Sequence, residues 1–84
     1  MQSTQINLLL VAIDNIDKIY NSDADWEYKY DRIFSFSKST VYPLLDELGI
    51  NLGYYDPDTT YKEDVTAYYY AIMEIKSNLE KEGY

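Results

Sequence analysis

A capped, amphipathic helix is predicted over residues 60–79, which read TYKEDVTAYYYAIMEIKSNL. Thr60 and Glu63 have the spacing of a capping box, in which two side chains satisfy free backbone groups at a helix start. Side chains of one helix face then recur at three- and four-residue steps: Val65, Tyr68, Tyr69, Ile72, Ile75, Lys76 and Leu79. That period is typical of a helix with one buried face. Lys76 falls on this stripe, so we expect its long side chain to extend the ammonium to water.

Two more helices are predicted at the start of the chain. The first begins at Ser3 or Thr4 and ends near residue 20, with an apolar stripe of Ile6, Leu9, Leu10, Ile13, Ile16 and Tyr20. The second begins within residues 22–25, Ser-Asp-Ala-Asp, which have the acids that favour a helix start. Its inward face is expected to hold Trp26, Tyr30, Ile33 and Phe34.

A short third helix is predicted over residues 40–49. Thr40 would cap it, with Pro43 in the first turn, where the missing N–H costs little. Leu44, Leu45 and Leu48 are its apolar residues, and Gly49 followed by Ile50 is typical of a left-handed end. A loop over residues 51–59 would turn at Asp56-Pro57-Asp58.

These elements predict an all-α fold, a single bundle of three to four helices over residues 1–84. One alternative is a short strand over residues 51–55, because tyrosine favours strands and Gly53 weakens a helix. Residues 34–36 would be its pairing partner.

Composition limits the function. The chain has no Cys and no His, which argues against most nucleophile–base catalysis and nearly all zinc chemistry. The turn at residues 56–58 lacks the acid and glycine spacing of an EF-hand. We therefore expect no enzyme, no catalytic residue, no metal and no cofactor. The apolar run of residues 8–13 is too short to span a bilayer, so a cytoplasmic protein without membrane contact is expected.

Charge points to a basic partner. The formal net charge is −8, with fifteen acids against seven Lys and Arg, which repels nucleic acid and attracts cationic surfaces. Residues 14–31 hold six of the acids and residues 46–64 hold six more. Because acids four apart on a helix repel, such clusters suggest a surface of carboxylates in place of phosphates. The alternative is that the charge serves only solubility. The candidate partner-binding residues are Asp14, Asp17, Asp23, Asp25, Glu27, Asp31, Asp46, Glu47, Tyr54, Tyr55, Asp56 and Asp58.

The eleven tyrosines divide into two groups. Four fall on the apolar stripes and are expected in the core, each with a hydroxyl reaching the surface: Tyr20, Tyr30, Tyr68 and Tyr69. Five fit the stripes less well and are expected to be exposed: Tyr28, Tyr54, Tyr55, Tyr70 and Tyr84. Exposed tyrosines among carboxylates are good interface anchors. Tyr54 and Tyr55 have an alternative role, which is to cover the open end of the bundle.

Two short stretches resemble known families. Residues 39–50, STVYPLLDELGI, look like the recognition helix of PadR-type winged-helix repressors, where the position of Asp46 is usually basic. With acids at Asp46 and Glu47, this segment would be repelled by DNA phosphates. Residues 49–52, GINL, followed by Pro57-Asp58-Thr59 and an aromatic-rich helix, are similar to the middle of Ocr-type antirestriction proteins of phages. That resemblance implies an acidic, mostly helical protein that imitates DNA.

Two functional hypotheses follow. The first is a phage- or mobile-element-type inhibitor that mimics nucleic acid and occludes the binding cleft of a basic host protein. Its target would be a restriction enzyme, a CRISPR effector, a repair glycosylase or a nucleoid protein. The second is a small helical interaction module without mimicry, including a self-associating homodimer. The two differ in where the acids lie, since mimicry requires them on one face.

Overall fold

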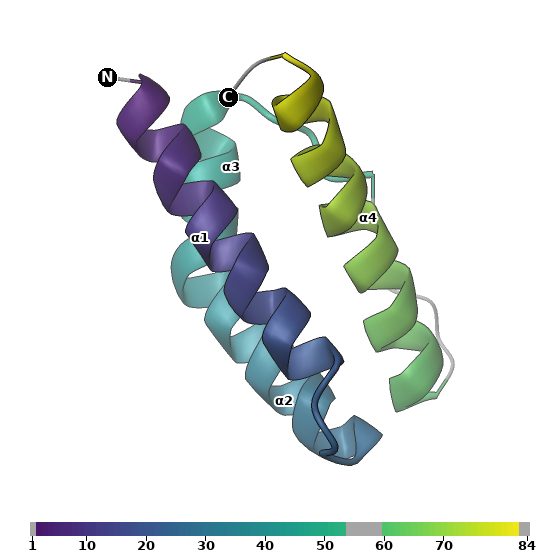
Figure 1. Cartoon of the computed structure of the whole chain (residues 1–84). Helices are drawn as coiled ribbons and strands as arrows, with labels where there is room; N and C mark the ends of the chain where they lie inside the picture. Colours follow the sequence, from purple (N-terminus) through teal and green to yellow (C-terminus); the bar gives the residue numbers. More distant parts are fainter. Residues whose placement is uncertain (1, 54–59, 83–84) are drawn as a thin grey trace.

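Three helical rods make up the part of the chain that the computed structural model describes, residues 2–53 and 60–82 (Figure 1). The first rod is α1 and the last is α4. The middle rod is one continuous helix in which a π-helical turn, η1, joins α2 to α3. The elements are α1 Gln2–Tyr20, α2 Trp26–Phe36, η1 Ser37–Val41, α3 Tyr42–Leu48 and α4 Tyr61–Lys81. The prediction of an all-α bundle is confirmed.

Most of the predicted helix ends are confirmed, each by a specific hydrogen bond. The Asp25 carboxylate accepts from the Tyr28 N–H at 2.8 Å and caps α2. The Thr60 hydroxyl accepts from the Glu63 N–H at 3.2 Å and caps α4. At the end of α3, Gly49 has φ of 68°, a left-handed conformation that glycine adopts without strain.

One predicted cap is wrong. Because α1 already begins at Gln2, Ser3 and Thr4 lie inside the helix and neither residue is the cap.

The predicted break before a separate third helix is also wrong. Thr40 lies inside η1, where the Tyr42 N–H bonds to the Ser37 carbonyl five residues back. In a regular helix the ring of Pro43 would clash with the carbonyl four residues earlier. The wider π turn accommodates the proline without ending the rod, which explains why the helix start predicted at Thr40 and Pro43 is not a break in the structure.

The strand alternative finds no support in the described residues. Residues 34–36, its proposed partner, are helical, and residues 51–53 form no strand. Tyr54 and Tyr55, together with the predicted turn at residues 56–58, lie outside the described residues.

The core is formed where the apolar stripes of the three rods meet. Its buried members are Ile6, Leu9, Ala12, Ile13, Ile16, Ile33, Val41, Leu45, Val65, Tyr68, Ile72, Ile75 and Leu79. Full burial of one such aliphatic side chain contributes about 1.5–3 kcal/mol. Trp26, Tyr30 and Phe34 pack against this cluster, as predicted for the inward face of α2.

The division of the tyrosines into core and exposed groups is confirmed wherever the structure describes them. The expectation that the Tyr68 hydroxyl reaches the surface is wrong, because that hydroxyl donates to the buried Ser37 hydroxyl. Tyr68 is fully buried, while Tyr20, Tyr30 and Tyr69 are half-buried against the core. Tyr28 and Tyr70 are exposed. Tyr54, Tyr55 and Tyr84 lie outside the described residues.

Candidate functional site

The two candidate acids of α1 lie at the contact with α4. The Asp17 carboxylate accepts hydrogen bonds from the Tyr69 hydroxyl at 2.5 Å and from the Asn21 amide at 3.0 Å. The bond to Asp17 raises the pKa of Tyr69, and burial raises it further. Asp14 forms an ion pair with Lys76 at 3.4 Å, so Lys76 reaches a carboxylate as well as water. Both acids thus join α1 to α4.

The candidate acids of the middle rod lie elsewhere. Glu27 and Asp31 are exposed on α2, and Asp23 and Asp25 are exposed at its start. Asp46 and Glu47 are exposed on α3, where Glu47 accepts from the Gln5 amide at 2.9 Å. The remaining candidates, Tyr54, Tyr55, Asp56 and Asp58, lie outside the described residues.

The described candidate acids therefore do not form one array. Asp14 and Asp17 contact α4, and Glu47 contacts the start of α1. The four acids at residues 23, 25, 27 and 31 are exposed and lie close together in the sequence, just before and within α2.

Lys29 is a buried cation that the sequence analysis did not single out. Its side chain is 6% exposed, donates to the Tyr20 carbonyl at 2.7 Å and lies 4.4 Å from the Trp26 ring centre. A cation at the last carbonyls of α1 interacts favourably with the helix dipole. The sequence signal was its spacing, three residues after Trp26 and four before Ile33. Lys29 therefore holds the beginning of α2 against the end of α1.

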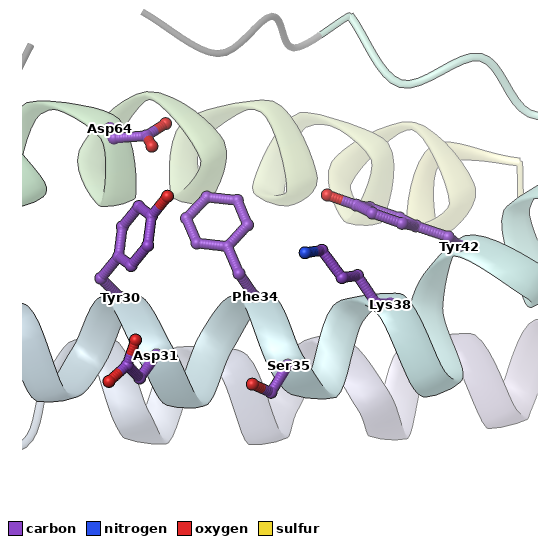
Figure 2. A pocket seen from close by; sticks show the side chains of 7 residues that line it. All are labelled: Tyr30, Asp31, Phe34, Ser35, Lys38, Tyr42 and Asp64. Carbon is purple, nitrogen blue, oxygen red and sulfur yellow. The ribbon is translucent and has the colours of Figure 1, made fainter. Parts of the chain in front are cut away.

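A polar pocket of about 290 Å³ opens between α2 and α4. Figure 2 shows Lys38 and the carboxylate of Asp64 on its walls, with the rings of Tyr30, Phe34 and Tyr42 around them. Asp64 is buried. The pocket holds charges of both signs, and its volume is at the lower limit of small-molecule sites, roughly 300–1,000 Å³. We assign it no ligand.

A larger, apolar groove lies between α1 and the middle rod. Its volume is about 640 Å³, and among the described residues its lining comes from Leu8, Val11, Ala12, Asn15, Phe36, Ser39, Thr40 and Leu44. Leu8 is 54% exposed and Val11 is 67% exposed, although both are large aliphatic side chains. None of these eight described lining residues carries a charge, in a chain with fifteen acids. We call this feature the α1 groove.

The α1 groove continues into a second hollow of about 360 Å³ toward the start of α2. The two share Asn15, Phe36 and Ser39. The second hollow adds Asp31 and Arg32, so this end of the combined surface is charged.

The sequence contained a signal for the α1 groove. Residues 8–13 are six consecutive apolar residues, and a helix cannot turn six successive positions to one side. Leu9, Ala12 and Ile13 are buried, so Leu8 and Val11 project on the outside. By its length alone, this run excluded a membrane span but did not reveal the groove.

Other site types gain no support from the described residues. None of the described helices has both the length and the apolar character needed to cross a membrane. Within the same residues, no cluster of three Asp or Glu side chains is arranged to hold a metal ion.

Comparisons with family models, with curated proteins and with solved structures give no match to this chain. The class that fold and site define is thus a small, acidic, all-α protein with an exposed apolar groove.

Proposed function

We propose that the chain is a protein-binding module and that the α1 groove is its contact surface. The observation that carries the proposal is the pair Leu8 and Val11, which are 54% and 67% exposed beside an uncharged groove. Contiguous exposed apolar surface is kept on small soluble proteins mainly where a partner covers it. The clustered acids then act on the rate and selectivity of association, because charge steers encounters over about a Debye length.

The test compares two single substitutions of equally exposed residues. Val11→Ser removes apolar surface at the groove, and Tyr70→Ser removes it on α4, where Tyr70 is 65% exposed. Tagged versions are used to retain partners from bacterial lysate, and circular dichroism checks the helix content. We expect Tyr70→Ser to keep the partners of the original chain and Val11→Ser to lose them. Unchanged retention by Val11→Ser would contradict the proposal.

A second candidate function, nucleic-acid mimicry, is favoured by the exposed acids at residues 23, 25, 27 and 31. Together they could pair with Lys and Arg in the cleft of a basic DNA-processing protein. The chain would then act as a competitive inhibitor of the phage or mobile-element type. None of these four acids belongs to the apolar lining of the α1 groove, although Asp31 lies in the hollow that continues it.

Mimicry is tested by neutralising these four acids to Asn or Gln, which keeps Asn as a good helix cap at position 25. We expect the variant to lose competition with DNA for a restriction enzyme or nucleoid protein. Binding of the unaltered chain should also weaken in ~1 M NaCl, where charges are screened within about 3 Å. Full affinity at that salt concentration would exclude mimicry as the function. The expectation that the chain is not an enzyme stays a prediction.

A further inference from the structure

We propose that the occupant of the α1 groove is a basic amphipathic α-helix of a partner protein. This inference rests on the proposed function, because it names the kind of partner that the same surface would bind. Three properties of the surface support it: its position between two helices, its length, and the charge around its apolar floor.

The position of the groove matches the packing site of a fourth helix. α4 packs against α1 and α2, and among the described residues the groove lining comes only from α1 and the middle rod. A helix laid in this groove would pack between two helices, as in a four-helix bundle. The middle of the floor has small side chains, Ala12, Ser39 and Thr40. Small residues allow a helix axis to approach to the usual 8–10 Å, roughly.

The π turn contributes to this floor. Ser39 and Thr40 belong to η1, and the Ser39 hydroxyl donates to the Phe36 carbonyl at 3.1 Å. With its hydroxyl directed to its own backbone, Ser39 presents little polar surface to an occupant. π turns occur frequently at functional sites.

The length of the surface sets the length of the occupant. With its continuation, the groove runs along α1 from Leu8 to Ile19, which is ~16 Å at about 1.5 Å per residue. An occupying helix therefore needs about three turns. Its apolar residues should recur at three- and four-residue steps to follow Leu8, Val11 and Phe36.

Charge selects between a foreign helix and a second copy of this chain. The net charge of −8 makes two copies repel, whereas it attracts a cationic segment. At one end, the continuation of the groove is lined by Asp31 and by Arg32, whose guanidinium lies 5.8 Å from the ring centre of Tyr28. At the other end Glu47 lies three residues after the lining residue Leu44 and bonds to Gln5. An apolar stripe flanked by Lys or Arg would meet the groove and these acids together.

The probes are three synthetic helical peptides of about 15 residues. The first has a leucine stripe flanked by lysines, the second has the same stripe flanked by glutamates, and the third has the residues of the first in scrambled order. Fluorescence anisotropy at low salt gives each Kd, and amide chemical shifts locate the binding surface. The protein variants are Leu8→Ser with Val11→Ser, and Tyr70→Ser as the control.

We expect the lysine-flanked peptide to bind at least tenfold tighter than either other peptide. The double groove variant should weaken that binding at least tenfold, while Tyr70→Ser should leave it unchanged. The shifted amides should belong to α1 and the middle rod. Equal binding of the lysine- and glutamate-flanked peptides would overturn the choice of a basic partner, and equal binding of the scrambled peptide would overturn the helix.

Two other outcomes separate this inference from the proposed function. A dimer in sedimentation equilibrium that the double groove variant dissociates would place a second copy in the groove. That result overturns the basic helix and leaves the protein-binding module standing. If no peptide binds, the basic helix is overturned. The proposed function fails with it only when Val11→Ser also retains every partner in the lysate experiment.

Discussion

The two sides of α1 differ in the contacts that their side chains make. On the side of α4, polar side chains close the contact: Asp17 accepts from Tyr69, Asp14 pairs with Lys76, and the rings of Tyr20 and Tyr69 stack at 3.8 Å. On the side of the α1 groove, Leu8 and Val11 remain exposed. Among the described residues, α1 thus has one side with polar contacts to α4 and one side on which large aliphatic side chains stay exposed. The contacts with α4 contribute to folding, and the exposed side is the one that we propose for binding.

The core of the α4 side includes a hydrogen bond that ties the rods together. The Tyr68 hydroxyl donates to the Ser37 hydroxyl at 2.6 Å, and both residues are fully buried. Ser37 is the first residue of η1. The π turn is therefore held from α4 on its inner side, while Ser39 and Thr40 of the same turn line the α1 groove.

The strongest test of the difference between the two sides of α1 substitutes two adjacent leucines. Leu9 is fully buried and Leu8 is 54% exposed. We expect Leu9→Ala to lower the free energy of unfolding by about 2–5 kcal/mol, because it leaves a cavity in the core. Leu8→Ala should change it by less than about 0.5 kcal/mol while weakening partner binding. Urea denaturation of both variants gives the difference, and equal losses would refute the division of α1 into two sides.

The next largest effect is expected at the bond between α4 and the π turn. Tyr68→Phe should lower the free energy of unfolding by about 1–3 kcal/mol, because the buried Ser37 hydroxyl loses its donor. Ser37→Ala in the Tyr68→Phe background should cost less than Ser37→Ala alone. A double-mutant cycle in urea measures this coupling. Strictly additive costs would show that the bond contributes nothing to stability.

Alkaline pH should weaken the α4 side in particular. Burial raises the pKa of Tyr68, whereas a tyrosine in the unfolded chain ionises near pH ~10. The folded chain then holds a proton that the unfolded chain loses. The stabilisation is complete below pH ~10 and is lost as pH rises toward the folded pKa. Above pH ~10 this residue alone should lower the free energy of unfolding by about 1.4 kcal/mol per pH unit.

The measurement is urea denaturation between pH 8 and 11.5, roughly, for the original chain and for Tyr68→Phe. The variant should show a shallower decline, because the remaining shift comes mainly from Tyr69. Its pKa is raised first by the hydrogen bond to Asp17 and then by burial. Identical slopes in the two proteins would argue against a raised pKa at Tyr68.

The smallest effects are expected from the two acids that join α1 to α4. Asp17→Asn should cost about 1 kcal/mol, because the hydroxyl of Tyr69 loses a charged acceptor. Asp14→Asn should cost no more than about 0.5 kcal/mol, since its 3.4 Å pair with Lys76 is exposed to solvent. Thermal unfolding of the two variants in low and high salt separates their two stability losses. A larger loss from Asp14→Asn than from Asp17→Asn would reverse this ranking.

Much of the fold could be predicted because its signals are local. The cap at Thr60, the left-handed Gly49 and the stripe through Val65, Tyr68 and Ile72 each depend on residues a few positions apart. The predicted start of a separate third helix failed for the same reason. Thr40 and Pro43 are local start signals, and the π turn that accommodates the proline is held by Tyr68, which lies 31 residues after Ser37.

The candidate site could be predicted only in part. The apolar run of residues 8–13 implied that some of its side chains face outward, but it could not show what lies opposite. Phe36 and Leu44 complete the groove from a rod that the sequence divided into two helices. The acids were found by counting, yet counting could not show that Asp14 and Asp17 bond to α4.

By itself, the sequence determined an acidic, all-α chain with its helical stripes and most of its caps, because periodicity and capping act within a few residues. Only the tertiary structure decided the continuity of the middle rod, the burial of Lys29 beneath the end of α1 and the open side of α1. These features depend on which rods lie side by side. Contacts between residues far apart in the chain fix that arrangement.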